Sequence, residues 1–219
     1  HGSTGDQLYN CRFLYEIYTR AAPDYTGRVT VPVLWDKKRE TIVNNESREI
    51  MRMFDHAFAD LGDPSAPDLA PLDLLADIDA MIDANYEPVN NGVYKCGFAT
   101  TQEAYDEAIE SLFSRLDELD ALLQRQQWLI GDTLTEADIC LYTTLVRFDP
   151  VYAIHFKCSR RRIVDYPGLR RYLHDLWQIP AFRETTNMAH IRRHYYWSHE
   201  SINPHRIVAA APAVQAIDA

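Results

Sequence analysis

Two short strand patterns, joined by a polar turn and followed by a helix start, constrain this chain more than any other stretch. The first pattern is residues 28–36, RVTVPVLWD, and the second begins at residue 41 with TIVNN. β-Branched and aromatic residues favour extended structure, and the polar residues 37–40 are short enough to close a hairpin. Glu46 and Ser47 then open a helix predicted to reach about Leu61, and the amides at a helix start attract anions.

Pro32 lies inside the first strand pattern, where a proline removes a hydrogen-bond donor from the sheet. Either this strand lies at a sheet edge, or the Val31–Pro32 peptide bond is cis. A cis bond would turn the backbone N–H and C=O of Val31 outward, where they can pair with the peptide groups of a ligand. On local physics alone, a sheet edge and a capped helix explain these residues.

The composition is that of a globular protein and argues against two classes of partner. With 219 residues and 47% hydrophobic residues, the chain is long enough for one or two domains with a sizeable core. The formal net charge of −10 argues against a nucleic-acid-binding role. No apolar run approaches the roughly 20 residues of a membrane span. The four cysteines form no CxxC pair, so we expect a reduced, cytoplasmic protein.

The periodicity of apolar residues predicts two domains, 1–62 and 63–219, with a Pro-rich linker starting at the boundary and continuing to Pro71. The first contains a helix over residues 8–21, the two strands and the helix from Glu46. The second is predicted to be helical almost throughout. Its expected elements are a helix with an apolar stripe at residues 72, 75, 78, 82 and 86, a break at 87–92, an irregular segment 93–98, helices over 101–126, 135–150, 167–177 and 180–196, and an extended tail from residue 198.

A helix start at residues 131–139, GDTLTEADI, has a clear local mechanism. Thr135 is the expected N-cap, and Asp138 is its partner in a capping box. Leu134 and Ile139 occupy the positions of a hydrophobic staple. We therefore expect Asp138 to be structural, not catalytic.

The cysteines and histidines do not by themselves indicate a catalytic or metal site. Cys11 and Cys140 occupy apolar helix positions that core-filling cysteines favour. Cys96 and Cys158 fall in segments expected to be irregular and exposed, without a helix N-terminus or a base that would lower the thiol pKa. His190 and His194 are spaced to share a metal, but Arg192 and Arg193 would repel a cation and no carboxylates cluster nearby. We expect no metal.

Several strings resemble one protein family over nearly the whole chain. RVTVPVLWDKK, IVNNES, EIMRMF, NNGVYKCGFATTQEAYDEA, LTEADI, TTLVRFDPVYAIHFKC and INP resemble the glutathione transferases, and more narrowly the glutathionyl-hydroquinone reductases, which form their Xi class. The resemblance implies an α/β plus all-α fold, in which a thioredoxin-like N-terminal domain precedes an all-helical C-terminal domain. It also implies a reductase that converts glutathionyl-hydroquinones to hydroquinones through a cysteine–glutathione mixed disulfide.

The resemblance assigns roles to particular residues. Val31, with Pro32 shaping its backbone, is expected to hold the cysteinyl part of glutathione, and Glu46 and Ser47 its γ-glutamyl end. Arg28 is a weaker candidate for a carboxylate of glutathione. Tyr94, Tyr152 and Tyr195 match tyrosines that face the aromatic substrate in the family. Ordinary aromatic packing is the alternative explanation for all three.

The family's nucleophile has no counterpart in these 219 residues. Its Cys-Pro-Trp-Ala segment belongs to a strand–helix–strand unit that would precede residue 1, so we expect the nucleophilic cysteine upstream of His1. The family also implies a homodimer. Two alternatives stay open: a conventional conjugating glutathione transferase that uses a Ser or Tyr, and a non-catalytic glutathione-binding protein if no upstream cysteine exists.

Overall fold

The chain forms two compact units, each with its own secondary structure. The computed structural model describes residues 4–213 and 215–218, and the units are His1–Asp68 and Leu69–Ala219. This division lies within the Pro-rich stretch that follows residue 61. The domain boundary that the sequence places after residue 62 stays a prediction.

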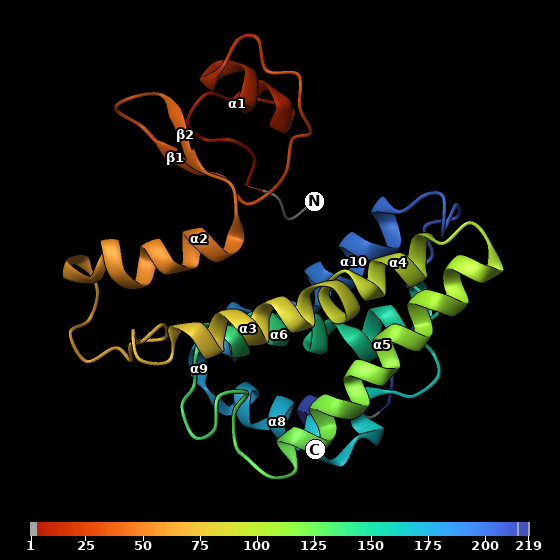
Figure 1. Cartoon of the computed structure of the whole chain (residues 1–219). Helices are drawn as coiled ribbons and strands as arrows, with labels where there is room; N and C mark the ends of the chain where they lie inside the picture. The colour runs from red at the N-terminus through yellow and green to blue at the C-terminus, as the bar shows by residue number, and fades with distance from the viewer. Residues whose placement is uncertain (1–3, 214, 219) are drawn as a thin grey trace. The chain divides into compact units, whose positions relative to one another are not determined.

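The first unit combines a helix, a hairpin and a second, segmented helix (Figure 1). Its elements are α1 (Leu14–Ala21), β1 (Leu34–Asp36), β2 (Thr41–Asn44), α2 (Ser47–Arg52), the π-helical η1 (Met53–Ala57) and the 3₁₀-helical η2 (Ala59–Leu61). The predicted hairpin is confirmed, since β1 and β2 pair antiparallel with Trp35 opposite Ile42. The paired part of the first strand is shorter than predicted, because residues 28–33 lie outside the ladder.

The predicted helix over residues 8–21 is wrong in its first half. The carboxylate of Asp6 accepts hydrogen bonds from the backbone N–H groups of Leu8, Tyr9 and Cys11. These bonds favour a turn over a helix because they occupy N–H groups that a helix would use. The helix begins only at Leu14, where Glu16 accepts the N–H of the N-cap residue Phe13 at 2.6 Å.

The helix from Glu46 begins where the sequence predicts but does not stay regular. Glu46 is its N-cap, with an extended backbone, and α2 passes at Met53 into η1. The last turn, η2, ends at Leu61. The Val31–Pro32 peptide bond is cis, which is one of the two alternatives that Pro32 leaves open in the sequence.

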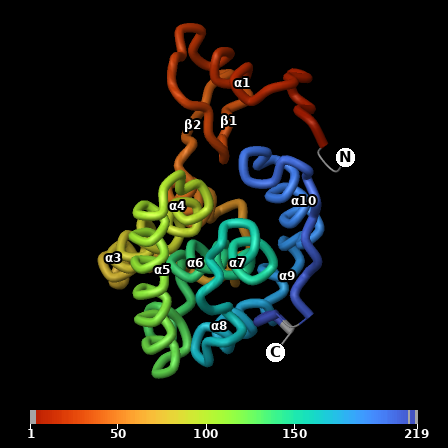
Figure 2. The backbone as a smooth tube through the Cα atoms, turned by 90° about the vertical axis from the view of Figure 1, so that its right-hand side faces the viewer, coloured from red at the N-terminus to blue at the C-terminus, as the bar shows by residue number. Residues whose placement is uncertain are grey.

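The second unit is helical, with α6 in its middle and α5 beside it (Figures 1 and 2). Its elements are α3 (Leu75–Asn85), η3 (Tyr86–Asn90), α4 (Gly92–Phe98), α5 (Gln102–Leu123), α6 (Glu136–Arg147), η4 (Phe148–Tyr152), α7 (Ala153–His155), η5 (Ile163–Asp165), α8 (Pro167–Gln178), α9 (Pro180–Thr185), α10 (Met188–Ser198) and η6 (Ala216–Asp218). One apolar core runs through the unit and includes Leu112, Leu116 and Leu141. Among the described helices, none is both long and apolar enough to cross a membrane.

Segment 93–98, predicted to be irregular, is the helix α4. Val93, Cys96 and Gly97 are buried on one side of it, and Cys96 and Val93 belong to the same core as α5. Burial of this face outweighs the weak helix propensity of the glycines. The apolar stripe predicted for the preceding helix is also partly wrong, because Leu72 and Tyr86 are exposed while Ile78 and Ile82 are buried.

Two further helix boundaries differ from the sequence prediction. The helix predicted to end near Pro150 continues through η4 and α7 to His155. The helix predicted over residues 180–196 is divided, because α9 ends at Thr185 and the Asn187 side chain caps α10 by accepting the N–H of His190.

The capping box at Thr135 and Asp138 is confirmed. Asp138 is fully buried and also accepts hydrogen bonds from the N–H of Leu129 at 3.0 Å and the hydroxyl of Tyr172 at 2.9 Å. Its carboxylate therefore joins the loop before α6 to α8, which is a structural role.

Candidate functional site

The residues expected to bind glutathione lie on the surface of the first unit. Arg28, Val31, Pro32, Glu46 and Ser47 are all exposed, and Val31 is 76% exposed. Within residues 4–213 and 215–218, the backbone N–H and C=O of Val31 have no hydrogen-bond partner. Val31 therefore presents a free donor and a free acceptor that can pair with the peptide groups of a ligand.

A hydrogen-bond cluster joins the two halves of this surface. Asn45, which precedes Glu46, donates from its amide nitrogen to the hydroxyl oxygen of Thr30 at 3.0 Å and to that of Tyr18 at 3.1 Å. The Tyr18 hydroxyl donates to the carbonyl of Thr30 at 2.8 Å and accepts the N–H of Thr30 at 3.2 Å. Since Thr30 precedes Val31, the cluster fixes Val31 relative to Glu46.

Tyr18 and Asn45 are functional candidates that the sequence analysis missed. Tyr18 is 3% exposed and lies on α1, twelve residues before Thr30. Its apolar spacing in the sequence indicates core packing alone. The sequence feature that could have identified Asn45 is the polar pair Asn44–Asn45 directly before Glu46. Asn side chains often form hydrogen bonds with backbone or polar groups at such junctions.

The structure brings the three predicted tyrosines of the second unit together. The Tyr195 hydroxyl lies 2.5 Å from that of Tyr94 and 2.8 Å from that of Tyr152. The three residues come from different elements, namely α4, η4 and α10. Their hydroxyls form one chain of hydrogen bonds with Tyr195 in the middle, which simple aromatic packing does not require.

Phe156 supports the rings of this tyrosine cluster, Tyr94, Tyr152 and Tyr195. Its ring stacks on that of Tyr152 with centroids 5.4 Å apart and planes at 8°. Phe156 also contacts the rings of Tyr94 and Tyr195, with centroids 5.3 and 5.8 Å away. Gly97 permits this packing, because a Cβ there would lie 2.2 Å from the Phe156 ring.

Burial keeps the inner two hydroxyls of the cluster protonated. Tyr152 is 2% and Tyr195 6% exposed, whereas Tyr94 is 38% exposed. Burial raises the pKa of Tyr152 and of Tyr195 above the usual tyrosine value, because the phenolate would lose its hydration. The two inner hydroxyls are therefore neutral, and the cluster reaches solvent at Tyr94. Such a chain can donate a hydrogen bond to a ligand oxygen at its exposed end.

The neighbouring Tyr196 lies outside the cluster. Its ring packs against His155 with centroids 4.8 Å apart, and its hydroxyl donates to the carbonyl of Pro150 at 3.4 Å.

The prediction that Cys96 and Cys158 are exposed is wrong. Both are 0% exposed, and both are free thiols. The hydrogen bond with the neighbouring Cys96 thiol, together with burial, raises the pKa of Cys158, which would make it a poor nucleophile. Cys11 and Cys140 are only partly buried. Burial and the Asp6 carboxylate raise the pKa of Cys11.

The histidines of α10 do not gather metal ligands. In the part of the chain that the structure describes, the ligand atoms that converge are those of Asp55, His56 and Asp68, which lie within 4.8 Å of one another. These side chains are exposed or half-buried, and exposed groups of this kind commonly occur without an ion.

Two family models match the chain, one in each compact unit. The model described as "Glutathione S-transferase, N-terminal domain" matches residues 9–57. The model described as "Glutathione S-transferase, C-terminal domain" matches residues 102–175.

Curated relatives and solved structures are similar along almost the whole chain. The glutathionyl-hydroquinone reductase YqjG of Escherichia coli (strain K12) is 55% identical over 211 residues, which are 96% of this chain and 64% of that protein. The glutathionyl-hydroquinone reductase PcpF of Sphingobium chlorophenolicum is 50% identical over 209 residues, 95% of this chain and 66% of that protein. The chain thus spans slightly less than two thirds of each relative.

The structural comparison gives the same result. The glutathione-bound structure of YqjG from Escherichia coli K-12, described as a glutathione transferase homolog, superposes with a TM-score of 0.94 at 54% identity, covering 98% of this chain and 70% of that one. Glutathione transferase Xi 1 from Trametes versicolor superposes with a TM-score of 0.92 at 50% identity, covering 97% of this chain and 74% of that one.

Proposed function

The chain belongs to the Xi class of the glutathione transferase family, and we propose that it acts as a glutathionyl-hydroquinone reductase. The observation that carries the proposal is the hydroxyl chain of Tyr94, Tyr195 and Tyr152. A hydroquinone has two oxygens on an aromatic ring, and aromatic walls with a few hydroxyl donors suit such a ligand. The names of two relatives support the same activity.

The proposed reaction has two steps. A cysteine thiolate attacks the sulfur of the glutathionyl-hydroquinone, so that a sulfur–sulfur bond forms, the carbon–sulfur bond breaks and the ring carbon takes up a proton. The thiolate of a second glutathione then attacks the mixed disulfide and releases glutathione disulfide and the free cysteine thiolate. One glutathione is thereby consumed, and the hydroquinone is freed from its thioether.

We place the nucleophile upstream of His1, as the family motif implies. Within the chain, Cys96 and Cys158 are fully buried, and the pKa of Cys11 is raised by burial and by Asp6. Cys140 is partly buried and packs against the apolar core. The hydrogen bond with the Cys158 thiol lowers the pKa of Cys96, but its burial keeps this thiol out of reach of a substrate.

The surface of the first unit is the proposed glutathione site. The unpaired backbone of Val31, shaped by Pro32, holds the cysteinyl part, while Glu46 and Ser47 hold the γ-glutamyl end. Arg28 is exposed and lies close to Val31 in the sequence. It is a candidate for binding a carboxylate of glutathione. The exposure of all five residues and the Tyr18–Asn45 hydrogen bonds support this assignment.

In the tyrosine cluster, Tyr94 is the proposed donor to a hydroquinone oxygen, because it is the most exposed of the three residues. Tyr195 and Tyr152 extend the network, so that the charge that develops on a ring oxygen as the carbon–sulfur bond breaks is shared along the hydrogen bonds. The proposed reaction needs no metal. We also propose a homodimer and a cytoplasmic location, the latter from the four free cysteines.

Product stoichiometry tests the proposal. The protein expressed from its complete coding sequence is incubated with 2-glutathionyl-1,4-hydroquinone and glutathione. We expect equal amounts of hydroquinone and glutathione disulfide, and a lower rate for Tyr195→Phe with unchanged glutathione affinity. Tyr15→Phe, at an exposed position of α1, serves as the control. Conjugation of 1-chloro-2,4-dinitrobenzene without release of hydroquinone would instead favour the conjugating transferase, and glutathione binding without either activity the binding protein.

A further inference from the structure

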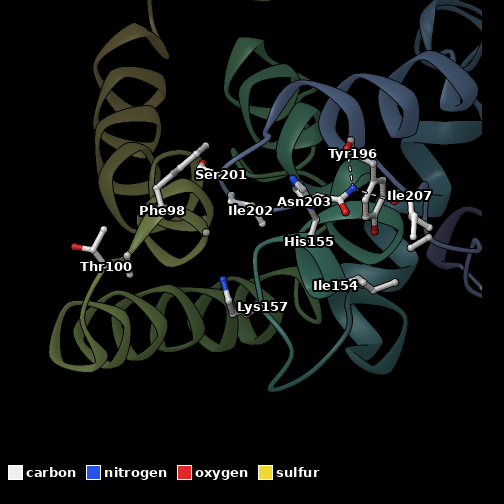
Figure 3. A pocket seen from close by; sticks show the side chains of 13 residues that line it. Phe98, Thr100, Ile154, His155, Lys157, Tyr196, Ser201, Ile202, Asn203 and Ile207 are labelled. Carbon is white, nitrogen blue, oxygen red and sulfur yellow. Dashed lines mark hydrogen bonds between the residues drawn. The ribbon is translucent and has the colours of Figure 1, made fainter. Parts of the chain in front are cut away.

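A pocket of the second unit lies outside the tyrosine cluster. It has a volume of about 640 Å³ and is lined by the end of α4, by residues around α7 and by the segment after α10. Figure 3 shows Phe98 on one side of this pocket, Ile154 and Ile207 on the other, and Lys157 between them. Its lining includes none of Tyr94, Tyr152 and Tyr195. A volume of this size lies in the range of small-molecule sites, about 300–1,000 Å³.

The walls of the pocket are formed by apolar side chains that the fold leaves in contact with solvent. Phe98, Ile154 and Ile207 are each large, apolar and exposed. They come from α4, from α7 and from the segment after α10, yet they line the same pocket. An exposed apolar surface that is gathered in a concave site commonly marks a ligand-binding site.

The charge of the pocket is opposite to that of the protein. The chain carries 32 acidic and 22 basic residues, yet Lys157 is the charged side chain of the lining and no carboxylate contributes to it. In the described part of the chain, the ammonium group of Lys157 has no ion-pair partner. By contrast, Lys95 pairs with Glu87 at 2.6 Å. An unpaired ammonium beside apolar walls favours an anionic group on a ligand.

The backbone holds Lys157 in an unusual conformation. Its φ angle is +60°, in the left-handed region that residues other than glycine rarely adopt. The Tyr105 hydroxyl donates to its carbonyl oxygen at 2.7 Å, and its own N–H donates to the carbonyl of Ile154 at 3.4 Å. Such conformations are unfavourable for residues other than glycine and are often retained at ligand sites.

Two further polar groups line the pocket and are fixed in place. The Nε2 atom of His155 lies 3.1 Å from Nδ1 of His199, which leaves Nδ1 of His155 without a hydrogen-bond partner in the described residues. Asn203 donates to the carbonyls of Tyr196 at 2.8 Å and Ile207 at 2.9 Å, and so holds the segment that carries Ile207. Burial, His199 and Lys157 lower the pKa of His155 to about 4. His155 is therefore neutral at pH 7, and the pocket has a single cation.

We propose that this pocket binds an aryl carboxylate, whose carboxylate pairs with Lys157 while its ring lies between Phe98, Ile154 and Ile207. A single ammonium and largely apolar walls suit one carboxylate on an apolar body better than a phosphate, which favours an arginine fork or several N–H donors. The imidazole of His155 offers one more polar contact. This binding function goes beyond the proposed reductase activity and does not depend on it.

Isothermal titration with 2-naphthoate as the probe tests the proposal at pH 7. We expect saturable binding of one naphthoate per chain, weakened at least about tenfold by Lys157→Met, which is the loss of roughly 1.4 kcal/mol. Lys38→Met, which removes the same charge from the hairpin turn, should bind like the wild type. Lys157→Arg should retain binding, and the neutral methyl ester of the probe should bind the wild type as weakly as naphthoate binds Lys157→Met.

Three results would overturn the proposal. One is the absence of saturable binding up to the solubility limit of the probe. Another is equal affinity of the wild type and Lys157→Met, with both variants shown to be folded by their thermal transitions. The third is loss of naphthoate binding in Tyr94→Phe, which would place the probe at the tyrosine cluster. None of these results affects the stoichiometry that tests the reductase, so the two proposals fail separately.

Discussion

The hydroxyl oxygens of Tyr152 and Tyr195 lie 2.8 Å apart, although the two residues are 43 positions apart in the chain. Their rings meet edge to face with centroids 5.3 Å apart. Both residues are almost fully buried, so their hydroxyls must be satisfied within the protein. The Tyr195 hydroxyl also meets that of Tyr94, and through it the buried pair is linked to solvent.

Tyr195→Phe should destabilise the protein by about 1–3 kcal/mol, because it removes the partner of the buried Tyr152 hydroxyl. Tyr152→Phe should cost less, since the Tyr195 hydroxyl keeps its bond to Tyr94. The double variant should lose less than the sum of the two. Urea unfolding of the wild type, the two single variants and the double variant measures these losses of stability. Additivity within about 0.3–0.5 kcal/mol would show that the two hydroxyls are independent.

Gly97→Ala should destabilise the protein by about 1–3 kcal/mol, the usual cost of overpacking. The new Cβ would lie 2.2 and 2.4 Å from two atoms of the Phe156 ring, so this ring, which stacks on Tyr152, must shift. Gly62→Ala is the matched control, because a Cβ there meets only the Ala59 carbonyl at 3.4 Å. Thermal unfolding of both variants checks the prediction, and equal transition temperatures would contradict it.

The stability of the protein should fall between pH 6.5 and pH 4 partly because of His155. Its pKa is lowered from 6.5 to about 4 by burial and by the neighbouring His199 and Lys157. In this range the unfolded chain binds a proton that the folded protein does not, so stability decreases as pH falls. The free energy of unfolding at pH 5 should therefore be about 1–2 kcal/mol lower than at pH 7 because of this group.

His155→Phe isolates this effect. The variant should lose its His199 hydrogen bond at every pH, but the difference in unfolding free energy between wild type and variant should change by about 1–2 kcal/mol from pH 7 to pH 5. Urea titrations at the two pH values measure it. A difference that is constant with pH would show that His155 is protonated as readily in the folded protein as in the unfolded chain.

Tyr18→Phe should weaken glutathione binding, although Tyr18 is not one of the residues proposed to contact the ligand. The change removes the hydroxyl that bonds Thr30 and Asn45, so Val31 is no longer fixed relative to Glu46. Loss of about 1 kcal/mol of positioning corresponds to a Kd increase of roughly fivefold. Calorimetry on the protein from its complete coding sequence measures the Kd, with Tyr15→Phe on the same helix as the control. An unchanged Kd would show that Tyr18 has only a packing role.

The sequence predicts local features of this fold well where a signal lies within a few residues. The hairpin, the helix start near residue 101, the capping box at Thr135 and the start of α8 near Pro167 all depend on neighbours in the chain. The grouping of Tyr94, Tyr152 and Tyr195 is different, since only the family resemblance relates three residues so far apart.

The prolines explain two of the wrong helix boundaries. Pro88 and Pro150 each predict a break, but both lie inside π-helical turns, η3 and η4, within longer helical stretches. A π-turn changes the local hydrogen-bond ladder, so a residue without an N–H is tolerated there. Val89 and Val151, which follow the two prolines, are fully buried, and their burial favours continuation. Local propensity does not contain that tertiary contribution.

The most direct test of the account is the location of the mixed disulfide with glutathione. The protein from its complete coding sequence is treated with glutathione disulfide, and its intact mass and peptide masses are measured before and after reduction. The account predicts one glutathione adduct, reversible by thiol, on a cysteine upstream of His1. An adduct on Cys11, Cys96, Cys140 or Cys158, or no adduct at all, would contradict the proposed reductase mechanism.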